Sequence, residues 1–339
     1  MSRPRIILAI ESSCDETAMA IIKGQKEILA SVVSSQIKDH ASFGGVIPEL
    51  ASRLHYQNID IVFDQVMKEA NLTIKDIDGI AIVNGPGLIG ALHVGVVFAK
   101  SLASINNIPI LPVNHIAGHV YANNLIADLQ FPLLALIVSG GHTELVYMEK
   151  HLDFKILGQT QDDAIGESYD KVARILNLGY PGGPIIDQLA QKGKDIYDFP
   201  MPLNDDSYNF SYSGLKSAVI NKVNTLKMKN EPFNNEDISA SFQKSAVDIL
   251  IKKSLHAAKT YPIKQFILGG GVAANSYLRS EIERVFKKQL PNVEVVLPPL
   301  WATTDNAAMI ASLASFYDEN EFKDDYGFGV NPNMSLDAN

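Results

Sequence analysis

The chain has 339 residues, of which 46% are hydrophobic and 20% charged, so it has enough apolar material for a globular fold of two domains or lobes. Its net charge of −9 argues against nonspecific binding of nucleic acid through a basic surface, but allows a local basic patch or binding shared with a partner protein. The single Cys14 excludes an internal disulfide and a multi-cysteine metal site. No apolar run approaches the roughly 20 residues that span a bilayer and no signal-peptide core is present, which predicts a soluble cytoplasmic protein with no membrane association.

The first half of the chain alternates between strand and helix patterns. Apolar runs predict strands at 6–10 and 18–22, joined by a tight polar turn, and a third strand at 27–35. A helix begins near Pro48, and a fourth strand ends at Val83. A glycine loop then leads into an apolar helix, and a fifth strand at 108–113 brings the chain to two histidines.

The second half repeats this order of elements without repeating the amino-acid sequence. Strands are predicted at 133–138, 144–147, 154–157, 265–268 and 293–297, with helices at 167–176, 215–227, 237–260 and 276–288. A loop-like insertion rich in Pro, Asn and Ser occupies 179–213. The duplication predicts two similar lobes, each a mixed sheet with helices, whose glycine-rich turns face a shared cleft. Such turns can approach phosphates closely because glycine has no Cβ.

Two histidines, His115 and His119, follow the fifth strand. If Asn114 caps a helix there, positions i and i+4 stack on one face with Cβ atoms roughly 5–6 Å apart, close enough for both rings to hold one metal ion. The alternative is one buried and one solvated helix histidine. Ile116 stands where a zinc metalloprotease has its catalytic Glu, which disfavours a hydrolytic site.

A third ligand is available in Asp305, which follows the last strand and opens an apolar helix. If the two lobes are pseudosymmetric, its loop corresponds to the histidine loop and faces it across the cleft. Two histidines and one carboxylate leave coordination positions open, as a catalytic metal requires. The alternative is that Thr304 or Asp305 simply caps the helix.

Other motifs are weak or absent. Residues 85–90 match G-x-G-x-x-G, but the acidic residue that a dinucleotide fold needs after the next strand is missing, because that strand ends at Asn114. The chain has neither the G-x-x-x-x-G-K-[ST] phosphate loop nor the G-x-S-x-G nucleophile turn.

Short motifs follow one another in a fixed order, at 10–17, 44–53, 85–90, 115–119, 138–143, 180–184, 210–216, 269–275 and 304–306. Together they resemble the bacterial tRNA N6-adenosine threonylcarbamoyltransferase family, formerly labelled O-sialoglycoprotein endopeptidase, from about residue 5 to 320. One departure is Asn114, where many relatives have another histidine.

The resemblance implies an α/β fold of the two-lobed, actin-like ATPase class, with mixed sheets flanked by helices. We expect an N-terminal lobe at 1–125, with a C-terminal helix at 306–326 that packs back onto it, and a C-terminal lobe at 126–305. The resemblance also implies that one divalent ion, Fe²⁺ or Zn²⁺, binds to His115, His119 and Asp305. The residues it implies around the substrate and its adenine nucleotide are Ile137, Val138, Ser139, Gly140, Gly141, Asp170, Gly183, Asp187 and Asn275.

The activity that the resemblance implies is transfer of threonylcarbamoyl from threonylcarbamoyl-AMP to N6 of adenosine 37 in tRNAs that read ANN codons, with release of AMP. Asp15 and Glu16, at the first polar turn, are candidates for handling the proton or positioning the amine, although a solvated turn is the plainer interpretation. The implied partners are a degenerate paralogue of the same fold, a P-loop ATPase and the synthase that makes the donor. Two other functions stay open, a small-molecule kinase on the same fold and a non-catalytic scaffold regulated by nucleotide.

Overall fold

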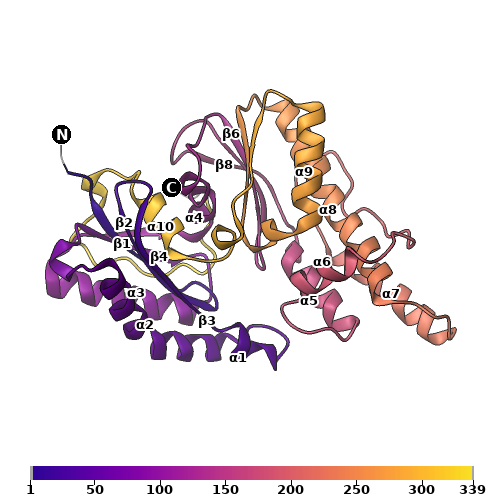
Figure 1. Ribbon diagram of the computed structural model, residues 1–339, viewed down its shortest axis with the longest axis horizontal. Helices are drawn as coiled ribbons and strands as arrows, with labels where there is room; N and C mark the ends of the chain where they lie inside the picture. Colours follow the sequence, from indigo (N-terminus) through magenta and orange to yellow (C-terminus); the bar gives the residue numbers. More distant parts are fainter. Residues whose placement is uncertain (1–2, 338–339) are drawn as a thin grey trace. The chain divides into compact units, whose positions relative to one another are not determined.

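The computed structural model describes residues 3–337. By its internal contacts the chain divides into two compact units, which we call unit 1 (Met1–Leu129 with Leu300–Asn339) and unit 2 (Gln130–Pro299). Figure 1 shows the last segment of the chain, in yellow, returning to the indigo and purple elements of unit 1.

Unit 1 is built on a five-stranded mixed sheet in the order β3-β2-β1-β4-β5. Its strands are β1 (Ile6–Glu11), β2 (Glu16–Lys23), β3 (Glu27–Ser35), β4 (Gly79–Gly85) and β5 (Ile110–Asn114). The first three strands pair antiparallel, whereas β4 and β5 run parallel to β1. The carboxyl ends of β1, β4 and β5 therefore lie at the same edge of the sheet, where the turn after β1 and the two histidines after β5 also lie.

Helices cover both faces of this sheet. They are α1 (Ile37–Ala41), α2 (Pro48–Ala70), α3 (Ile89–Asn106), α4 (His115–Tyr121) and α10 (Ala307–Ala314). Leu8 and Ile10 pack into one core cluster with residues of α2 and α3. Because side chains alternate along a strand, Ile7 and Ala9 point to the opposite face, where α10 contacts β1 and β2.

Helix α3 is long and apolar enough to cross a membrane by length and composition alone, the one such helix among residues 3–337. In the structure it lies against α2 and β4, with Val96, Ala99 and Ala103 in the core. This face resembles that of an ordinary core helix, whereas Ile89, Val97 and Ile105 of the same helix are exposed.

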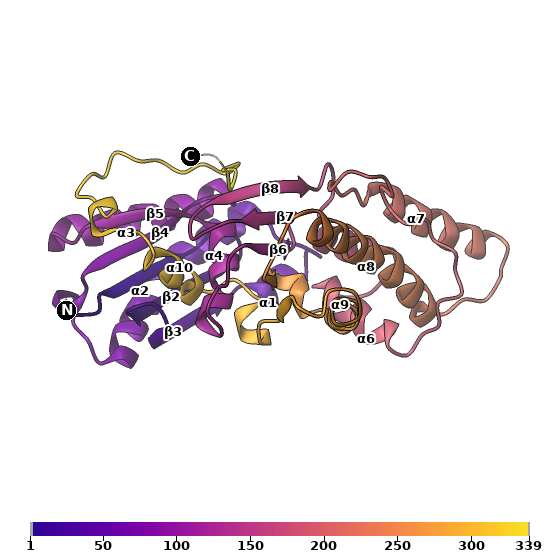
Figure 2. The ribbon, with the colours of Figure 1, turned by 90° about the horizontal axis from the view of Figure 1, so that it is seen from above.

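The C-terminal segment crosses the edge of unit 1 that carries the histidines. The backbone N–H of Asn331 donates to the carbonyl of Asn84 (2.8 Å), and the N–H of Gly87 donates to the carbonyl of Pro332 (3.1 Å). A Cβ on Gly85 would lie 2.0 Å from the carbonyl oxygen of Asn331, so only glycine permits this close approach. In Figure 2 the segment runs as a yellow strap along the β5 side of the unit.

Unit 2 repeats the same architecture. Its sheet has the order β10-β9-β6-β7-β8, which matches unit 1 strand for strand and confirms the predicted duplication. The strands are β6 (Leu133–Val138), β7 (Thr143–Met148), β8 (Phe154–Gln159), β9 (Gln265–Gly269) and β10 (Glu294–Val296). The antiparallel β7 and β8 exclude an all-parallel dinucleotide fold, as predicted.

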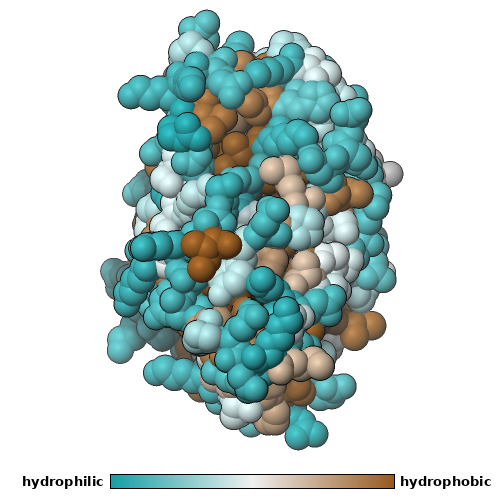
Figure 3. All heavy atoms as spheres, turned by 90° about the vertical axis from the view of Figure 1, so that its right-hand side faces the viewer, coloured by the Kyte–Doolittle hydropathy of each residue, from teal (hydrophilic) through white to brown (hydrophobic). Residues whose placement is uncertain are grey.

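Five helices complete unit 2: α5 (Ile165–Ile175), α6 (Gly182–Ala190), α7 (Ser213–Met228), α8 (Asn235–Thr260) and α9 (Ser276–Gln289). The segment 179–213 is thus not only a loop, because it contains α6, whose Ile186 lies in the core. The surface at the end of unit 2 that carries α7 is mostly hydrophilic, with hydrophobic side chains in separate groups (Figure 3).

The division into units differs from the sequence-based one at residues 126–129 and 300–305, which all belong to unit 1. All residues of α10 are buried, and the helix contacts β1, β2 and α4, so the loop that precedes it belongs to unit 1. Asp305 and both histidines therefore lie in a single unit. The prediction that Asp305 reaches the histidines from the opposite lobe was wrong, although the three residues do meet.

Candidate functional site

The helix that carries the histidines begins where the sequence predicts. The side chain of Asn114 caps α4, because its Oδ1 accepts hydrogen bonds from the backbone N–H groups of Ile116 (2.8 Å) and Ala117 (3.2 Å). His115 and His119 then lie on one face, with ring centroids 4.7 Å apart and ring planes at 79°. Both side chains are buried.

Asp305 lies beside both rings. Its Oδ1 is 3.6 Å from Nε2 of His115 and 3.2 Å from Nε2 of His119. The cap of α10 is the next residue, Asn306, whose Oδ1 accepts from the N–H of Met309 (3.0 Å). Asp305 is thus not needed as a cap. One ligand atom from each of the three side chains lies within 4.8 Å of the other two, so the group could hold one metal ion.

His119 supplies a direct test of that fit. Its side chain is fully buried, yet neither ring nitrogen makes a hydrogen bond. A buried polar atom without a partner costs about 1–3 kcal/mol, so native proteins rarely leave one unsatisfied. A metal ion bound to one ring nitrogen would remove this cost at that nitrogen. The His₂Asp set also leaves positions open for other ligands, and so it fits a catalytic or substrate-binding ion.

Glu11, the last residue of β1, fixes the orientation of His115. Its Oε2 accepts from the ring Nδ1–H of His115 at 2.8 Å, and its Oε1 accepts from the backbone N–H of Ser13 at 2.5 Å. With the proton assigned to Nδ1, the lone pair of His115 is on Nε2, the nitrogen nearer to Asp305. A carboxylate behind a ligand histidine is the usual partner in metal sites.

The same charges make the site attractive to a cation. Burial by itself lowers the pKa of His115, but the negative charges of Glu11 and Asp305, together with the hydrogen bond that the ring donates to Glu11, outweigh it and raise the pKa to about 9. A positive charge at this position is therefore stabilised by its neighbours. Our sequence analysis missed Glu11 as a site residue.

Asp15 and Glu16 lie at the β1–β2 turn in the same unit. Burial, followed by the negative charges of Asp15 and Asp305, raises the pKa of Glu16 well above its usual range. The hydroxyl of Ser35 donates to Glu16 Oε1 (3.2 Å) and opposes this shift only in part. The turn is therefore not a plain solvated one, because Asp15 is only 9% exposed.

A neutral histidine of α2 holds this turn in place. His55 Nε2 donates to the carbonyl of Cys14 (2.9 Å), so its Nδ1 accepts from the hydroxyl of Thr17 (2.8 Å). Burial lowers the pKa of His55, which keeps the ring in this neutral form. Burial and neighbouring carboxylates also raise the pKa of the Cys14 thiol, so it stays protonated.

The predicted substrate residues of unit 2 begin at the end of β6. Ile137 and Val138 are fully buried strand residues. Ser139 closes the turn to β7, because its hydroxyl accepts from the N–H of His142 (3.0 Å) and its own N–H donates to the carbonyl of His142 (2.8 Å). Gly140 and Gly141 lie at the tip, where an added Cβ would meet no atom within 4 Å. The tip thus presents bare backbone.

Another open glycine, Gly183, lies at the start of α6. Asp170 on α5 accepts from the N–H of Gly182 at 2.7 Å, which ties the two helices together. A Cβ on Gly182 would lie 2.6 Å from Cβ of Ala173, whereas one on Gly183 would meet nothing. The carboxylate of Asp170 is thus partly used by the fold, and the adjacent Gly183 faces open space.

Asp187 and Asn275 are joined in one hydrogen-bond network, in which Asn275 is buried and Asp187 is half-buried. Asp187 accepts from Nε2 of Gln243 (2.9 Å) and from the hydroxyl of Ser276 (2.8 Å). Asn275 caps α9 and donates from Nδ2 to Gln243 Oε1 (2.8 Å) and to the hydroxyl of Tyr169 (3.2 Å). Both predicted residues therefore hold α9 in place. Gln243 and Tyr169, which sequence reasoning missed, connect them.

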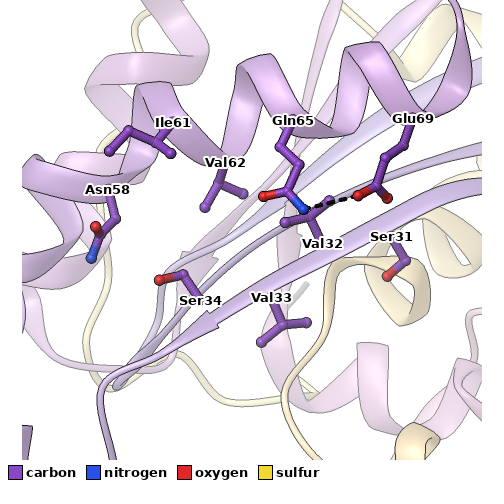
Figure 4. A pocket seen from close by; sticks show the side chains of 9 residues that line it. All are labelled: Ser31, Val32, Val33, Ser34, Asn58, Ile61, Val62, Gln65 and Glu69. Carbon is purple, nitrogen blue, oxygen red and sulfur yellow. Dashed lines mark hydrogen bonds between the residues drawn. The ribbon is translucent and has the colours of Figure 1, made fainter.

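A hollow of about 340 Å³ lies elsewhere in unit 1, between β3 and α2 (Figure 4). Its one carboxylate, Glu69, accepts a hydrogen bond from the side chain of Gln65 at 2.9 Å. The remaining lining residues are aliphatic or uncharged, and the side chains of Val33 and Ile61 are exposed to solvent. The hollow thus has one exposed carboxylate, and it has neither a second acid–base group nor a set of metal ligands.

Comparison with known proteins points to one family. The profile of TsaD, tRNA N6-adenosine threonylcarbamoyltransferase, matches residues 27–312. The chain is 52% identical to the tRNA N6-adenosine threonylcarbamoyltransferase of Bacillus anthracis, over 100% of this chain and 98% of the relative. It is 50% identical to the enzyme of that name from Listeria welshimeri, over 99% and 98% of the two chains.

Solved structures with the same fold are more distant in sequence. HypF of T. kodakarensis aligns with a TM-score of 0.63 at 15% identity, over 95% of this chain and 49% of HypF. Component A of (R)-2-hydroxyglutaryl-CoA dehydratase from Acidaminococcus fermentans aligns with a TM-score of 0.54 at 15% identity, over 91% and 97%. Together with the two duplicated mixed sheets, these similarities confirm the predicted actin-like fold class.

Proposed function

We propose that the donor is threonylcarbamoyl-AMP and that the acceptor is adenosine 37 of ANN-reading tRNAs. The chain belongs to the tRNA N6-adenosine threonylcarbamoyltransferase family, and so it transfers a threonylcarbamoyl group to N6 of adenosine in tRNA. In this reaction the bond between N6 and the carbamoyl carbon forms, and the bond from that carbon to the phosphate oxygen breaks. AMP leaves with the electron pair, and N6 loses one proton. The family assignment favours this transfer over the kinase and scaffold functions.

We place the nucleotide part of the donor on unit 2, at residues 137–141, Asp170, Gly183, Asp187 and Asn275. The bare glycines at the turn after β6 and at the start of α6 support this assignment, because a phosphate or a ribose can lie directly against backbone there. Backbone N–H groups at the turn can donate to phosphate oxygens and stabilise the departing AMP. Asp187 and Asn275 would then act mainly by holding α9 beside the nucleotide.

We assign one divalent ion, Fe²⁺ or Zn²⁺, to His115, His119 and Asp305. The observation that carries this assignment is that the buried ring nitrogens of His119 make no hydrogen bond, although Nε2 lies 3.2 Å from the Asp305 carboxylate. When bound, such an ion supplies a positive charge that can orient the donor and polarise one of its oxygens. By holding a proton on Nδ1, Glu11 leaves Nε2 of His115 as the nitrogen that would bind the ion, which takes the place of the Nε2 proton.

We assign the proton from N6 to the carboxylates of Asp15 and Glu16. A carboxyl group whose pKa is raised toward neutrality is a better base than an ordinary one, and the pKa of Glu16 is shifted in this direction. As N6 bonds to the carbamoyl carbon its proton becomes more acidic, and a carboxylate within reach can accept it. The hydrogen bonds of His55 keep the turn that carries these two residues in one conformation.

The proposal extends to the setting of the reaction. We expect a cytoplasmic enzyme that works with a degenerate paralogue of the same fold and with a P-loop ATPase, and that receives its donor from a threonylcarbamoyl-AMP synthase. The acidic composition is consistent with protein partners that share the contact with tRNA.

The test is a transfer assay with purified protein, threonylcarbamoyl-AMP and unmodified tRNA, followed by mass analysis of the nucleosides and of bound metal. We expect His115→Ala and His119→Ala to lose both metal and threonylcarbamoyl-adenosine formation. Loss of activity in His115→Ala with normal metal content would contradict the ligand assignment. Full activity after replacement of both Asp15 and Glu16 by Ala would remove the proposed proton acceptors.

A further inference from the structure

The turn before Asp305 exposes the only tryptophan of the chain. Trp301 lies in a short helical turn, Leu300–Ala302, and is 51% exposed, next to Leu300 at 64%. Tryptophan is large and apolar, and it is mostly buried in folded proteins. Trp301 and Leu300 together offer a ligand an apolar surface that includes an aromatic ring.

The backbone around Trp301 is held firmly. Both the N–H and the hydroxyl of Thr303 donate to the carbonyl of Leu300, at 3.2 and 2.8 Å, and Ala302 and Thr303 are completely buried. Asn306, the cap of α10, also donates to the carbonyl of Thr304 (2.8 Å). The indole is thus attached to a fixed turn rather than to a flexible loop.

Trp301 is also close to the metal-ligand group. It is four positions before Asp305, and an extended chain advances at most about 3.6 Å per residue, so the two Cα atoms lie no more than about 14 Å apart. A tRNA whose adenosine N6 reaches the site must bring neighbouring nucleotides of the same single-stranded loop within this distance.

Resting on the function proposed above, we propose that Trp301 is a stacking platform for a nucleobase of the tRNA loop that carries the target adenosine. Proteins that recognise single-stranded RNA replace lost base stacking by contact with aromatic side chains. A chain with a net charge of −9 gains little from general attraction to phosphates, so stacking on an uncharged ring has more effect on affinity here.

The single tryptophan makes the contact directly measurable. The full-length chain is titrated with a synthetic anticodon stem-loop that carries adenosine at position 37, and indole emission is followed together with the anisotropy of a label on the RNA. We expect the emission to be quenched in step with binding, and AMP alone to leave it unchanged. An unchanged emission at saturating stem-loop would overturn the proposal.

Kinetics distinguish stacking from a structural role. Trp301→Ala should raise the KM for tRNA about 5- to 150-fold, since one stacked base contributes about 1–3 kcal/mol. The KM for threonylcarbamoyl-AMP and the melting temperature should stay unchanged, and Trp301→Phe should restore most of the affinity. The control is Ile105→Ala, which removes another exposed apolar side chain of unit 1, at the end of α3.

The outcomes separate this inference from the function on which it rests. If wild-type protein forms no threonylcarbamoyl-adenosine from the donor and tRNA, the proposed function fails. If wild-type protein is active and Trp301→Ala keeps the wild-type KM for tRNA, only the stacking role fails. Equal increases for Trp301→Ala and Ile105→Ala would likewise contradict a specific contact.

Discussion

Replacement of Glu11 by Gln tests whether this carboxylate orients the metal-ligand histidine. The substitution keeps the shape of the side chain, which is 1% exposed and lies 2.8 Å from Nδ1 of His115 and 2.5 Å from the N–H of Ser13. The two donors reach different oxygens of Glu11, and glutamine has an NH₂ group in place of one of them, so in this geometry it accepts from only one donor.

Either orientation of the introduced amide would harm the site. If its oxygen accepts from Ser13, its NH₂ group faces Nδ1 of His115 and moves the ring proton to Nε2, the nitrogen that must bind the metal. If its oxygen accepts from His115, its NH₂ opposes the N–H of Ser13, and a buried donor loses its partner at a cost of about 1–3 kcal/mol. Loss of such a supporting carboxylate lowers metal affinity about 10- to 100-fold, or about 1.4–2.8 kcal/mol.

The assay is competition for Zn²⁺ or Fe²⁺ between the protein and a coloured chelator. We expect Glu11→Gln to bind metal about 10- to 100-fold more weakly and to recover activity at high metal concentration, whereas His119→Ala should not recover. Glu27→Gln, at an exposed position of β3, is the control for the loss of a carboxylate. Wild-type metal affinity in Glu11→Gln would refute the orienting role.

Three further predictions concern the start of α6, the β1–β2 turn and the C-terminal segment. Gly183→Ala should weaken AMP binding without lowering the melting temperature, because the added Cβ enters open space. Gly182→Ala should lower the melting temperature, because the added Cβ would lie 2.6 Å from the side chain of Ala173. Equal melting temperatures of the two variants would contradict this prediction. Asp15→Asn should move the acidic limb of the pH–rate profile to lower pH, because loss of a neighbouring negative charge lowers the raised pKa of Glu16 and keeps that carboxylate ionised in more acidic solution; an unmoved limb would exclude Glu16 as the base. Deletion of residues 329–339 should lower the free energy of unfolding by about 2–4 kcal/mol in denaturant titrations, because it removes several hydrogen bonds to the edge of unit 1. An unchanged free energy of unfolding would show that this C-terminal segment does not stabilise the unit.

Features with local signals were predictable from the sequence. Asn114 followed by two histidines at i and i+4 specifies a capped helix with both rings on one face, and this is how α4 forms. Strand–turn–strand patterns at two places in the chain likewise revealed the duplicated sheets, because the alternation of apolar and polar runs is a local property.

Features that depend on long-range packing were not predictable in this way. Glu11 and His115 are 104 positions apart in sequence, and only the parallel pairing of β1, β4 and β5 brings them together. The side on which Asp305 lies depends on α10, whose uniformly apolar sequence does not show which sheet it covers. Helix α6 was hidden because its first turn contains two glycines and a proline, which suggest a loop.

The central claim is that the group formed by His115, His119 and Asp305 serves the transfer of threonylcarbamoyl to tRNA. The most direct measurement is mass analysis of tRNA nucleosides from cells in which the chain is depleted and replaced by wild type or by His119→Ala. We predict that threonylcarbamoyl-adenosine disappears on depletion, returns with wild type, and stays absent with a folded His119→Ala protein. Persistence of the modified nucleoside after depletion, or its full return with His119→Ala, would contradict the account.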